Sequence, residues 1–175
     1  MANTRNNPLE DLAMHIPMIC ERYELRDDVS PGAGKFRGGI GVVKAQRMLS
    51  PGFITHESER HNDTPWGIFG GKPGAVGKCE IYNVADGLPP RVMHSKFHGL
   101  EVKTDDVMVY YSPCGGGYGN PLERPAAKVL EDVLDEFCTL ANARDIFGVV
   151  IDLETETVDI PSTERVRAAM RAGSL

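Results

Sequence analysis

The chain has 175 residues, which suits one domain with a real core and leaves little room for two catalytic domains. Its formal net charge of -6, with no cluster of Lys and Arg, argues against nucleic acid as a partner. It has neither an apolar leader nor a run of about 18 apolar residues, so we expect a soluble, cytoplasmic protein.

The first two thirds of the chain carry patterns typical of strands. Imperfect alternation over residues 18–25 predicts a strand, and the apolar run from Gly38 towards Leu49 predicts a second strand antiparallel to it. Turn residues dominate between 50 and 86, so strands there must be short. Residues 98–112 are apolar again, and Lys103–Asp106 within them predicts a hairpin turn.

Helical spacing begins after Pro125. Apolar residues recur at spacings of one and four from Val129 to Cys138, which predicts a helix with Asp132 on its polar face. Charged Lys128, Glu131 and Asp135 share that polar face.

Three further elements complete the C-terminal part. Thr139 is expected to cap a second short helix that Gly148 ends, because hydroxyl N-caps and glycine C-caps are common. Residues 149–151 predict a strand, and a last helix is expected over about 163–172. The fold class is therefore α+β: a strand-rich, glycine-rich body over 1–124, with short helices over 125–175 as an appendage of the same domain.

Two glycine-rich stretches invite a comparison with nucleotide-binding loops. Residues 113–121 lie between a strand and a helix, but they lack a Gly-Lys-Ser/Thr ending, so we favour a turn with positive φ and close backbone packing over a phosphate cradle. Residues 32–41 only partly imitate a dinucleotide fingerprint. We interpret them as a bent connection with Lys35 and Arg37 in solvent.

The only tryptophan stands in a third glycine-rich stretch, residues 66–74. An aromatic side chain between glycines either fills a core or faces a partner. Filling a core is the more frequent outcome, and an interface role for Trp66 is the alternative that a long loop supports.

The histidines and cysteines are the side chains that could bind a metal ion or act as nucleophiles. His94 and His98, if on a strand, would be about 13 Å apart, which is too far to share one ion. A second group, His56 to His61, holds ligand-type side chains, but exposed or hydrogen-bonded histidines are more frequent than ligands, so no metal is expected in this chain. Cys114 has no base nearby in sequence. The four cysteines are expected to be reduced thiols, although two disulfides are arithmetically possible.

Several separated segments, in order, resemble the C-terminal region of hydantoinase B/oxoprolinase proteins. The segments are Asn3-Thr4 with Pro8-Leu9-Glu10, Glu21–Arg26, Gly32–Val43, Pro65–Gly74, Gly115–Arg124 and Phe147–Val150. Asn120 stands where that family usually has Asp, which weakens any role of this side chain in binding a cation.

The resemblance implies assembly into a larger enzyme. Members of the family hydrolyse hydantoins or 5-oxoproline with ATP, or carboxylate acetone and acetophenone, beside a hydantoinase A-like partner with an ATPase-like fold. Metal- and substrate-binding residues are associated mostly with the portion that precedes this region, so no catalytic residue is carried over. ATP and a divalent metal are expected in the complex and none in this chain.

The expected function is a small subunit of an ATP-dependent, biotin-independent ketone carboxylase of the acetophenone or acetone type, completing a hydantoinase B-like large subunit. The segment's own Met1 suggests such a split. Alternatives are a subunit of an ATP-dependent hydantoinase or 5-oxoprolinase, and a non-catalytic scaffold. The chain is not expected to be active alone. The candidate loop or interface residues are Trp66, Gly70, Gly71, Gly115, Gly116, Gly117, Tyr118 and Gly119.

Overall fold

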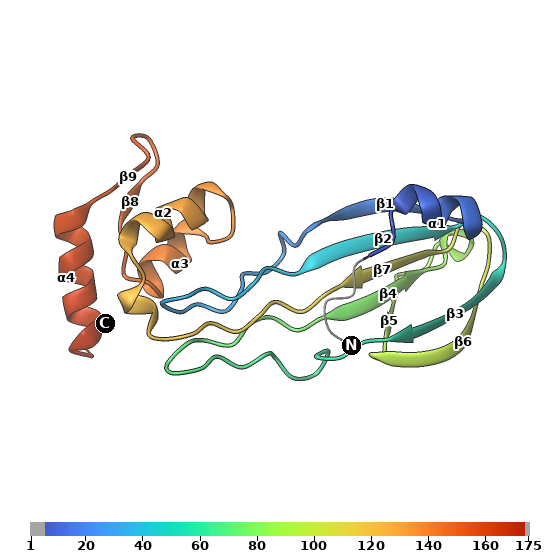
Figure 1. The fold of residues 1–175 in the computed structure, drawn as a ribbon, viewed down its shortest axis with the longest axis horizontal. Helices are drawn as coiled ribbons and strands as arrows, with labels where there is room; N and C mark the ends of the chain where they lie inside the picture. The colour runs from blue at the N-terminus through green and yellow to red at the C-terminus, as the bar shows by residue number, and fades with distance from the viewer. Residues whose placement is uncertain (1–5, 174–175) are drawn as a thin grey trace. The chain divides into compact units, whose positions relative to one another are not determined.

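The computed structural model describes residues 6–173, so Asn3 and Thr4 lie outside the described residues. The chain forms two compact units that are each discontinuous in sequence (Figure 1), a division that the sequence patterns do not predict. Unit 1 is built from Met1–Leu25, Val42–Asn62 and Gly77–Ser112. Unit 2 is built from Arg26–Gly41, Asp63–Val76 and Pro113–Leu175.

Unit 1 contains an antiparallel five-stranded sheet with the order β1-β2-β7-β4-β5 and a two-stranded ribbon of β3 and β6. Helix α1 precedes β1 and the 3-10 turn η1 follows β4. The bounds are α1 Leu9–His15, β1 Met18–Leu25, β2 Val42–Met48, β3 Gly52–Glu57, β4 Lys78–Tyr82, η1 Val84–Asp86, β5 Arg91–Met93, β6 Lys96–Val102 and β7 Val107–Tyr111.

The first two predicted strands are confirmed. β1 pairs antiparallel with β2, and Leu25 lies opposite Val42. A bulge between Cys20 and Arg22 accounts for the imperfect alternation seen in the sequence. Helix α1 is not predicted by the sequence pattern, and it ends at the residues before Pro17, since a residue preceding proline disfavours helical geometry.

One hydrophobic cluster of unit 1 lies on the face of the sheet that carries Val43, Ala45 and Val109. Ala45 is opposite Val109 in the β2–β7 register, so their side chains share that face. On the other face the β3–β6 ribbon contacts the sheet through His56, whose ring lies 5.3 Å from that of Tyr110.

The predicted hairpin at Lys103–Asp106 is wrong. A turn does form there, with Asp105 at a φ of 69° and the Asp106 carboxylate accepting from the N–H of Lys103 at 2.8 Å. However, β6 pairs with β3 and β7 pairs with β2 and β4. The turn therefore carries the chain from the ribbon into the sheet, because each strand finds its partner elsewhere.

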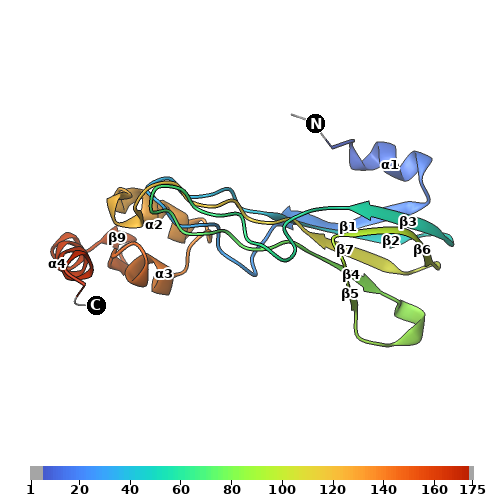
Figure 2. The same ribbon diagram turned by 90° about the horizontal axis from the view of Figure 1, so that it is seen from below.

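Unit 2 combines extended glycine-rich segments with short helices. Most helices therefore follow the main strands in the chain, which confirms the α+β class. Its core contains Val129, Ala143, Phe147 and Val149. Seen from below, the helices cluster at the end of these segments (Figure 2). The bounds are η2 Pro121–Glu123, α2 Ala126–Leu134, α3 Leu140–Asp145, β8 Ile151–Asp152, β9 Thr157–Val158 and α4 Ile160–Arg171.

The predicted helices are present with altered ends. α2 stops at Leu134, since Glu136 takes a φ of 63°, so Phe137 and Cys138 lie beyond the helix. Thr139 caps α3 as predicted, accepting from the N–H of Asn142 at 3.1 Å, and Gly148 has the expected positive φ of 63°.

The last two elements differ from the prediction in length. The strand expected over 149–151 is reduced to Ile151–Asp152. α4 begins at Ile160, because Asp159 rather than a later residue caps it by accepting from the N–H of Ser162 at 3.0 Å. No helix among residues 6–173 is both long enough and apolar enough to cross a membrane.

Candidate functional site

Three extended segments of unit 2, residues 30–41, 65–76 and 113–119, run side by side and form what we call the glycine bundle (Figures 1 and 2). They are held by backbone hydrogen bonds outside any regular ladder. The N–H of Gly117 donates to the carbonyl of Lys72 at 2.9 Å, and the N–H of Lys72 donates to that of Ala33 at 2.7 Å. Each segment therefore contacts the others through its main chain.

Glycine is required in the bundle because the backbones are too close for side chains. A Cβ on Gly71 would lie 2.1 Å from the carbonyl oxygen of Gly117, and one on Gly116 would lie 2.0 Å from that of Trp66. Collagen places glycine at its crowded axis for the same steric reason. A Cβ added to Gly38, Gly74 or Gly117 would likewise lie 2.0, 2.0 or 2.1 Å from a neighbouring carbonyl oxygen.

The expected close backbone packing of residues 113–121 is thus confirmed, whereas the expected positive φ holds in the glycine run only at Gly119, at 76°. Gly115 is less crowded, since its nearest contact for a Cβ is 3.0 Å. Gly70, in the second segment, has a φ of 90° and open space beside it. Among the candidate glycines, Gly71, Gly116 and Gly117 therefore form the crowded frame of the bundle.

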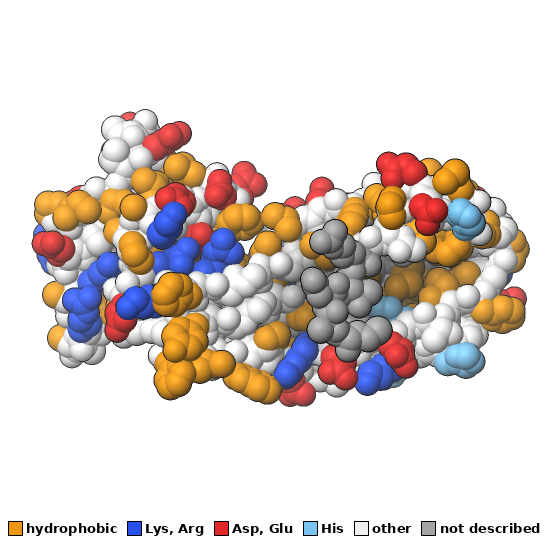
Figure 3. Space-filling model, viewed as in Figure 1, with side chains coloured by type: hydrophobic (Ala, Val, Ile, Leu, Met, Phe, Trp, Pro, Cys, Tyr) orange, Lys and Arg blue, Asp and Glu red, His pale blue; other side chains and the backbone are white. Residues whose placement is uncertain are grey.

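Apolar side chains project outward from this frame. The backbones of Phe36 and Ile68 each form an isolated β-bridge with Tyr118. The Tyr118 ring lies 6.2 Å from that of Phe36 and 5.3 Å from that of Phe69. We call these four residues the aromatic patch. Figure 3 shows hydrophobic side chains gathered at the lower left, where Figure 1 places the loop of residues 65–76.

All four side chains of the patch are strongly exposed: Phe36 61%, Ile68 47%, Phe69 76% and Tyr118 49%. Trp66 is 66% exposed, so the interpretation of this residue as a core plug is wrong, and the interface alternative stays a prediction. Of the patch, sequence reasoning identified Tyr118 but missed Phe36, Ile68 and Phe69. One signal was available, because Ile68 and Tyr118 directly follow the crowded glycines Gly67 and Gly117.

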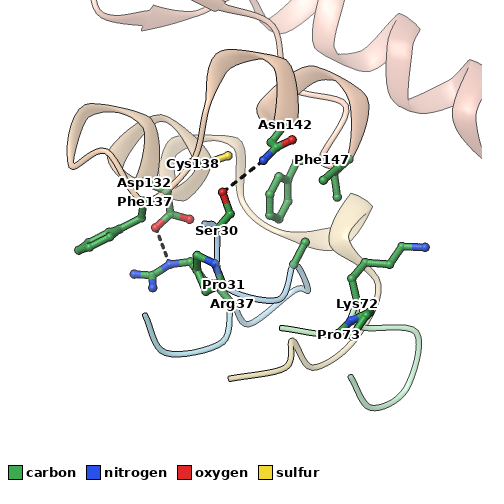
Figure 4. A pocket seen from close by; sticks show the side chains of 12 residues that line it. Ser30, Pro31, Arg37, Lys72, Pro73, Asp132, Phe137, Cys138, Asn142 and Phe147 are labelled. Atoms are coloured by element: carbon green, nitrogen blue, oxygen red, sulfur yellow. Dashed lines mark hydrogen bonds and ion pairs between the residues drawn. The ribbon is translucent and has the colours of Figure 1, made fainter. Parts of the chain in front are cut away.

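Beside the core of unit 2, Arg37 and Arg124 share one buried acid, Asp132. Figure 4 shows the pair of Arg37 and Asp132. Arg37 Nε donates to Asp132 Oδ1 at 2.9 Å, and Arg124 Nη2 lies 2.8 Å from Oδ2. The Arg37 guanidinium also stacks 4.6 Å from the centre of the Phe137 ring. The predictions of a solvent-exposed Arg37 and a solvent-facing Asp132 are therefore wrong, whereas Lys35 is half-exposed and pairs with Glu123 at 3.3 Å.

Arg37, Asp132 and Phe137 border a cavity of about 180 Å³ (Figure 4). Asn142 Nδ2 donates to Ser30 Oγ at 3.3 Å on one wall. Burial, together with the nearby Asp132 carboxylate, raises the pKa of the Cys138 thiol in another wall to about 11. A thiol with that pKa stays protonated near neutral pH, so this cavity holds no activated cysteine.

His56 lies in an aromatic cluster of unit 1, with its ring 5.3 Å from those of Phe97 and Tyr110 and 6.3 Å from that of His61. His56 Nε2 is buried without a hydrogen-bond partner, and burial and the neighbouring His61 lower the pKa of His56. His98 Nδ1 lies 3.1 Å from Thr55 Oγ1, and His94 lies between β5 and β6. Within residues 6–173, no group of three or more His, Cys, Asp or Glu side chains could hold a metal ion.

The cysteines form no disulfide with one another, as expected for thiols. Cys114 is fully buried, and its Sγ accepts from the N–H of Gly41 at 3.3 Å. Burial, together with the charge of Glu80, also raises the pKa of Cys79 to about 11. These thiols contribute to packing.

Comparison with known proteins identifies a consistent group of relatives. Residues 1–121 match the family described as hydantoinase B/oxoprolinase. A protein from Pseudomonas sp. (strain NS671), described as the B-type subunit of a D-/L-hydantoinase, is 41% identical over 167 residues, which cover 95% of this chain and 28% of that protein. The acetophenone carboxylase delta subunit of Aromatoleum aromaticum is 30% identical over 80% of this chain and 25% of its own length.

The fold is also found in solved structures. The ATP-dependent caprolactamase from Pseudomonas jessenii superimposes with a TM-score of 0.73 at 27% identity, covering 94% of this chain and 28% of that chain. This chain thus spans little more than a quarter of the relatives that it matches.

Proposed function

Because the chain belongs to the hydantoinase B/oxoprolinase family, we propose that it forms the C-terminal part of a B-type subunit in an ATP-dependent enzyme that opens cyclic amides. The observation that carries this proposal is the 41% identity to a B-type hydantoinase subunit across 95% of the chain. The 27% identity to an ATP-dependent caprolactamase, over 94% of the chain, supports the same reaction class, since hydantoins and caprolactam are both cyclic amides.

The proposed contribution of this chain is structural: it completes a subunit whose reacting groups lie elsewhere. The crowded glycine frame and its exposed side chains support a role in assembly. Its partners would be hydantoinase A-like and B-like large subunits. ATP and a divalent metal belong to the whole assembly in this proposal, and because residues 6–173 offer no group of three metal-ligating side chains, we assign no metal-holding role to them.

Ketone carboxylation is the second candidate. The identity of 30% to the acetophenone carboxylase delta subunit, over 80% of the chain, favours it. Ring opening is placed first because the hydantoinase relative is more similar and covers more of the chain. A cytoplasmic location stays a prediction under either reaction.

The test is an assay of the assembled enzyme with and without this chain. We expect ATP-dependent ring opening of hydantoin, 5-oxoproline or caprolactam that requires all components. Fixation of labelled bicarbonate that depends on acetone or acetophenone, without ring opening, would select the second candidate. Full activity of this chain alone as a monomer, or full activity of the assembly without it, would overturn the structural role.

A further inference from the structure

We propose that the aromatic patch of Phe36, Ile68, Phe69 and Tyr118 is the docking surface for the remaining part of a hydantoinase B-type subunit. This inference rests on the proposed function and adds to it the surface that makes the contact. The patch and everything used to argue for it lie within unit 2.

The chemistry of the patch is that of an interface centre. Aromatic side chains are enriched in the cores of interfaces and among the residues that dominate binding energy. Two ring pairs at 5.3 and 6.2 Å make the exposed surface continuous around Tyr118. Continuous apolar surface of this kind marks a binding site more often than scattered exposed residues do.

The patch is also fixed in shape before any partner arrives. Phe36 and Tyr118 exchange two backbone hydrogen bonds, of 3.0 and 2.9 Å. Ile68 donates to Gly117 and accepts from Gly119, both at 2.9 Å. Because these backbones are locked by the glycine frame, ordering them on binding has little entropic cost, which favours affinity.

Phe69 adds a local sign of a constrained site. Its φ of 51° is uncommon for a bulky residue, and Gly70 follows with a φ of 90°. Such backbone outliers cluster at binding sites, where the surrounding structure enforces them. The turn presents the Phe69 side chain, 76% exposed, at the end of the loop.

A groove continues from the patch and specifies the chemistry of the occupant. It has a volume of about 620 Å³, and its walls include Phe69, Leu122 and Met170. Lys72 and Asp145 also line it, so the groove offers one cation and one anion. The occupant that fits is an apolar segment bearing charges of both signs.

The remaining B-type polypeptide is chosen as that occupant because the region matched by this chain is a small share of its B-type relatives. This chain covers 28% of the hydantoinase relative and 28% of the caprolactamase chain that shares the fold. In those proteins the same fold therefore adjoins a much longer stretch of polypeptide. Within a single chain or a tight complex, the high effective concentration would favour contact with an exposed apolar face.

The experiment measures binding of this chain to the B-type hydantoinase subunit of Pseudomonas sp. (strain NS671) from which the matching 28% has been removed. The test variant is Phe36→Ala/Tyr118→Ala. The control is Phe53→Ala/Leu88→Ala, which removes two side chains of unit 1 that are 77% and 70% exposed. Circular dichroism and thermal melting should show that both variants fold, since all four side chains are exposed.

We expect the test variant to lose roughly tenfold or more in affinity by calorimetry, and the control to bind like the wild type. Equal binding by the test variant would overturn the inference and leave the proposed function intact. The truncated subunit must first give the circular dichroism spectrum and cooperative thermal melt of a folded protein. Absence of binding by the wild-type chain to that folded subunit would then count against both the proposed function and the inference. Concentration-dependent dimerisation that only the test variant loses, with unchanged binding to the truncated subunit, would assign the patch to a second copy and overturn the inference.

Discussion

Replacing Gly71 by alanine should disrupt the glycine bundle, whereas the same change at Gly39 should be tolerated. A Cβ on Gly71 would lie 2.1 Å from the carbonyl oxygen of Gly117 and 2.4 Å from its carbon. Both atoms belong to the backbone, so the neighbouring segment would have to move by more than an ångström. At Gly39, by contrast, no atom lies within 4 Å of the added Cβ.

The movement would break backbone hydrogen bonds that hold the segments together. The bond from Gly117 N–H to the Lys72 carbonyl (2.9 Å) lies at the point of contact, and the bond from Lys72 to Ala33 (2.7 Å) follows it. A buried donor or acceptor left without a partner costs about 1–3 kcal/mol. Losing two such bonds gives a destabilisation of about 2–6 kcal/mol, which is a large part of the stability of an ordinary domain.

The assay is urea unfolding of both variants followed by far-ultraviolet circular dichroism, together with their soluble yield. Gly39→Ala should stay within about 0.5 kcal/mol of the wild type, or gain slightly because alanine restricts the unfolded chain. If the free energies of unfolding of Gly71→Ala and Gly39→Ala differ by less than about 1 kcal/mol, the steric reasoning is refuted.

Three other perturbations follow from the structure. Asp132→Ala should lower the free energy of unfolding by about 3 kcal/mol, because it leaves the buried Arg124 and the partly buried Arg37 without their acid. Lys128→Ala, which breaks an exposed pair, should change it by less than about 0.5 kcal/mol in the same urea titration. Iodoacetamide at pH 8 should alkylate Cys138 far more slowly than half-buried Cys20, because a pKa of about 11 leaves little thiolate; equal rates by mass spectrometry would contradict this. The folded pKa of His56 lies below its ordinary 6.5, so the contribution of His56 to stability is complete above pH 6.5 and is lost as the pH falls towards the folded pKa. Melting temperatures of the wild type and of His56→Gln at pH 7.5 and 5.5 measure this loss. An equal drop in melting temperature in both proteins would argue against a role for His56.

Local patterns in the sequence were sufficient for elements whose stabilisation is local. The strand over residues 18–25 and the Thr139 cap were both predicted, because alternation and capping depend on neighbouring residues. The ends of helices were harder to predict. The left-handed backbone of Glu136 prevents α2 from continuing, but the apolar spacing in the sequence runs on to Cys138 without a break.

Contacts between distant segments could not be read in this way. Asp132 was placed on a polar helix face, yet it is buried against Arg37, which is 95 positions away in sequence. A hint was present, since Asp132 lies three positions after Val129 of the apolar stripe, and residues at that spacing are neighbours on a helix. The bundle likewise depends on three glycine-rich stretches meeting, so each stretch read alone suggested a turn.

The interleaving of the two units has a consequence for how this protein can be dissected. The chain crosses from one unit to the other after Leu25, Gly41, Asn62, Val76 and Ser112. No single protease cut and no simple gene truncation can therefore release an intact unit. Each unit must recruit segments far apart in the chain, which slows folding and ties the fate of one unit to that of the other. Either unit would be obtained as an independent polypeptide only from a redesigned gene that joins its three segments directly to one another.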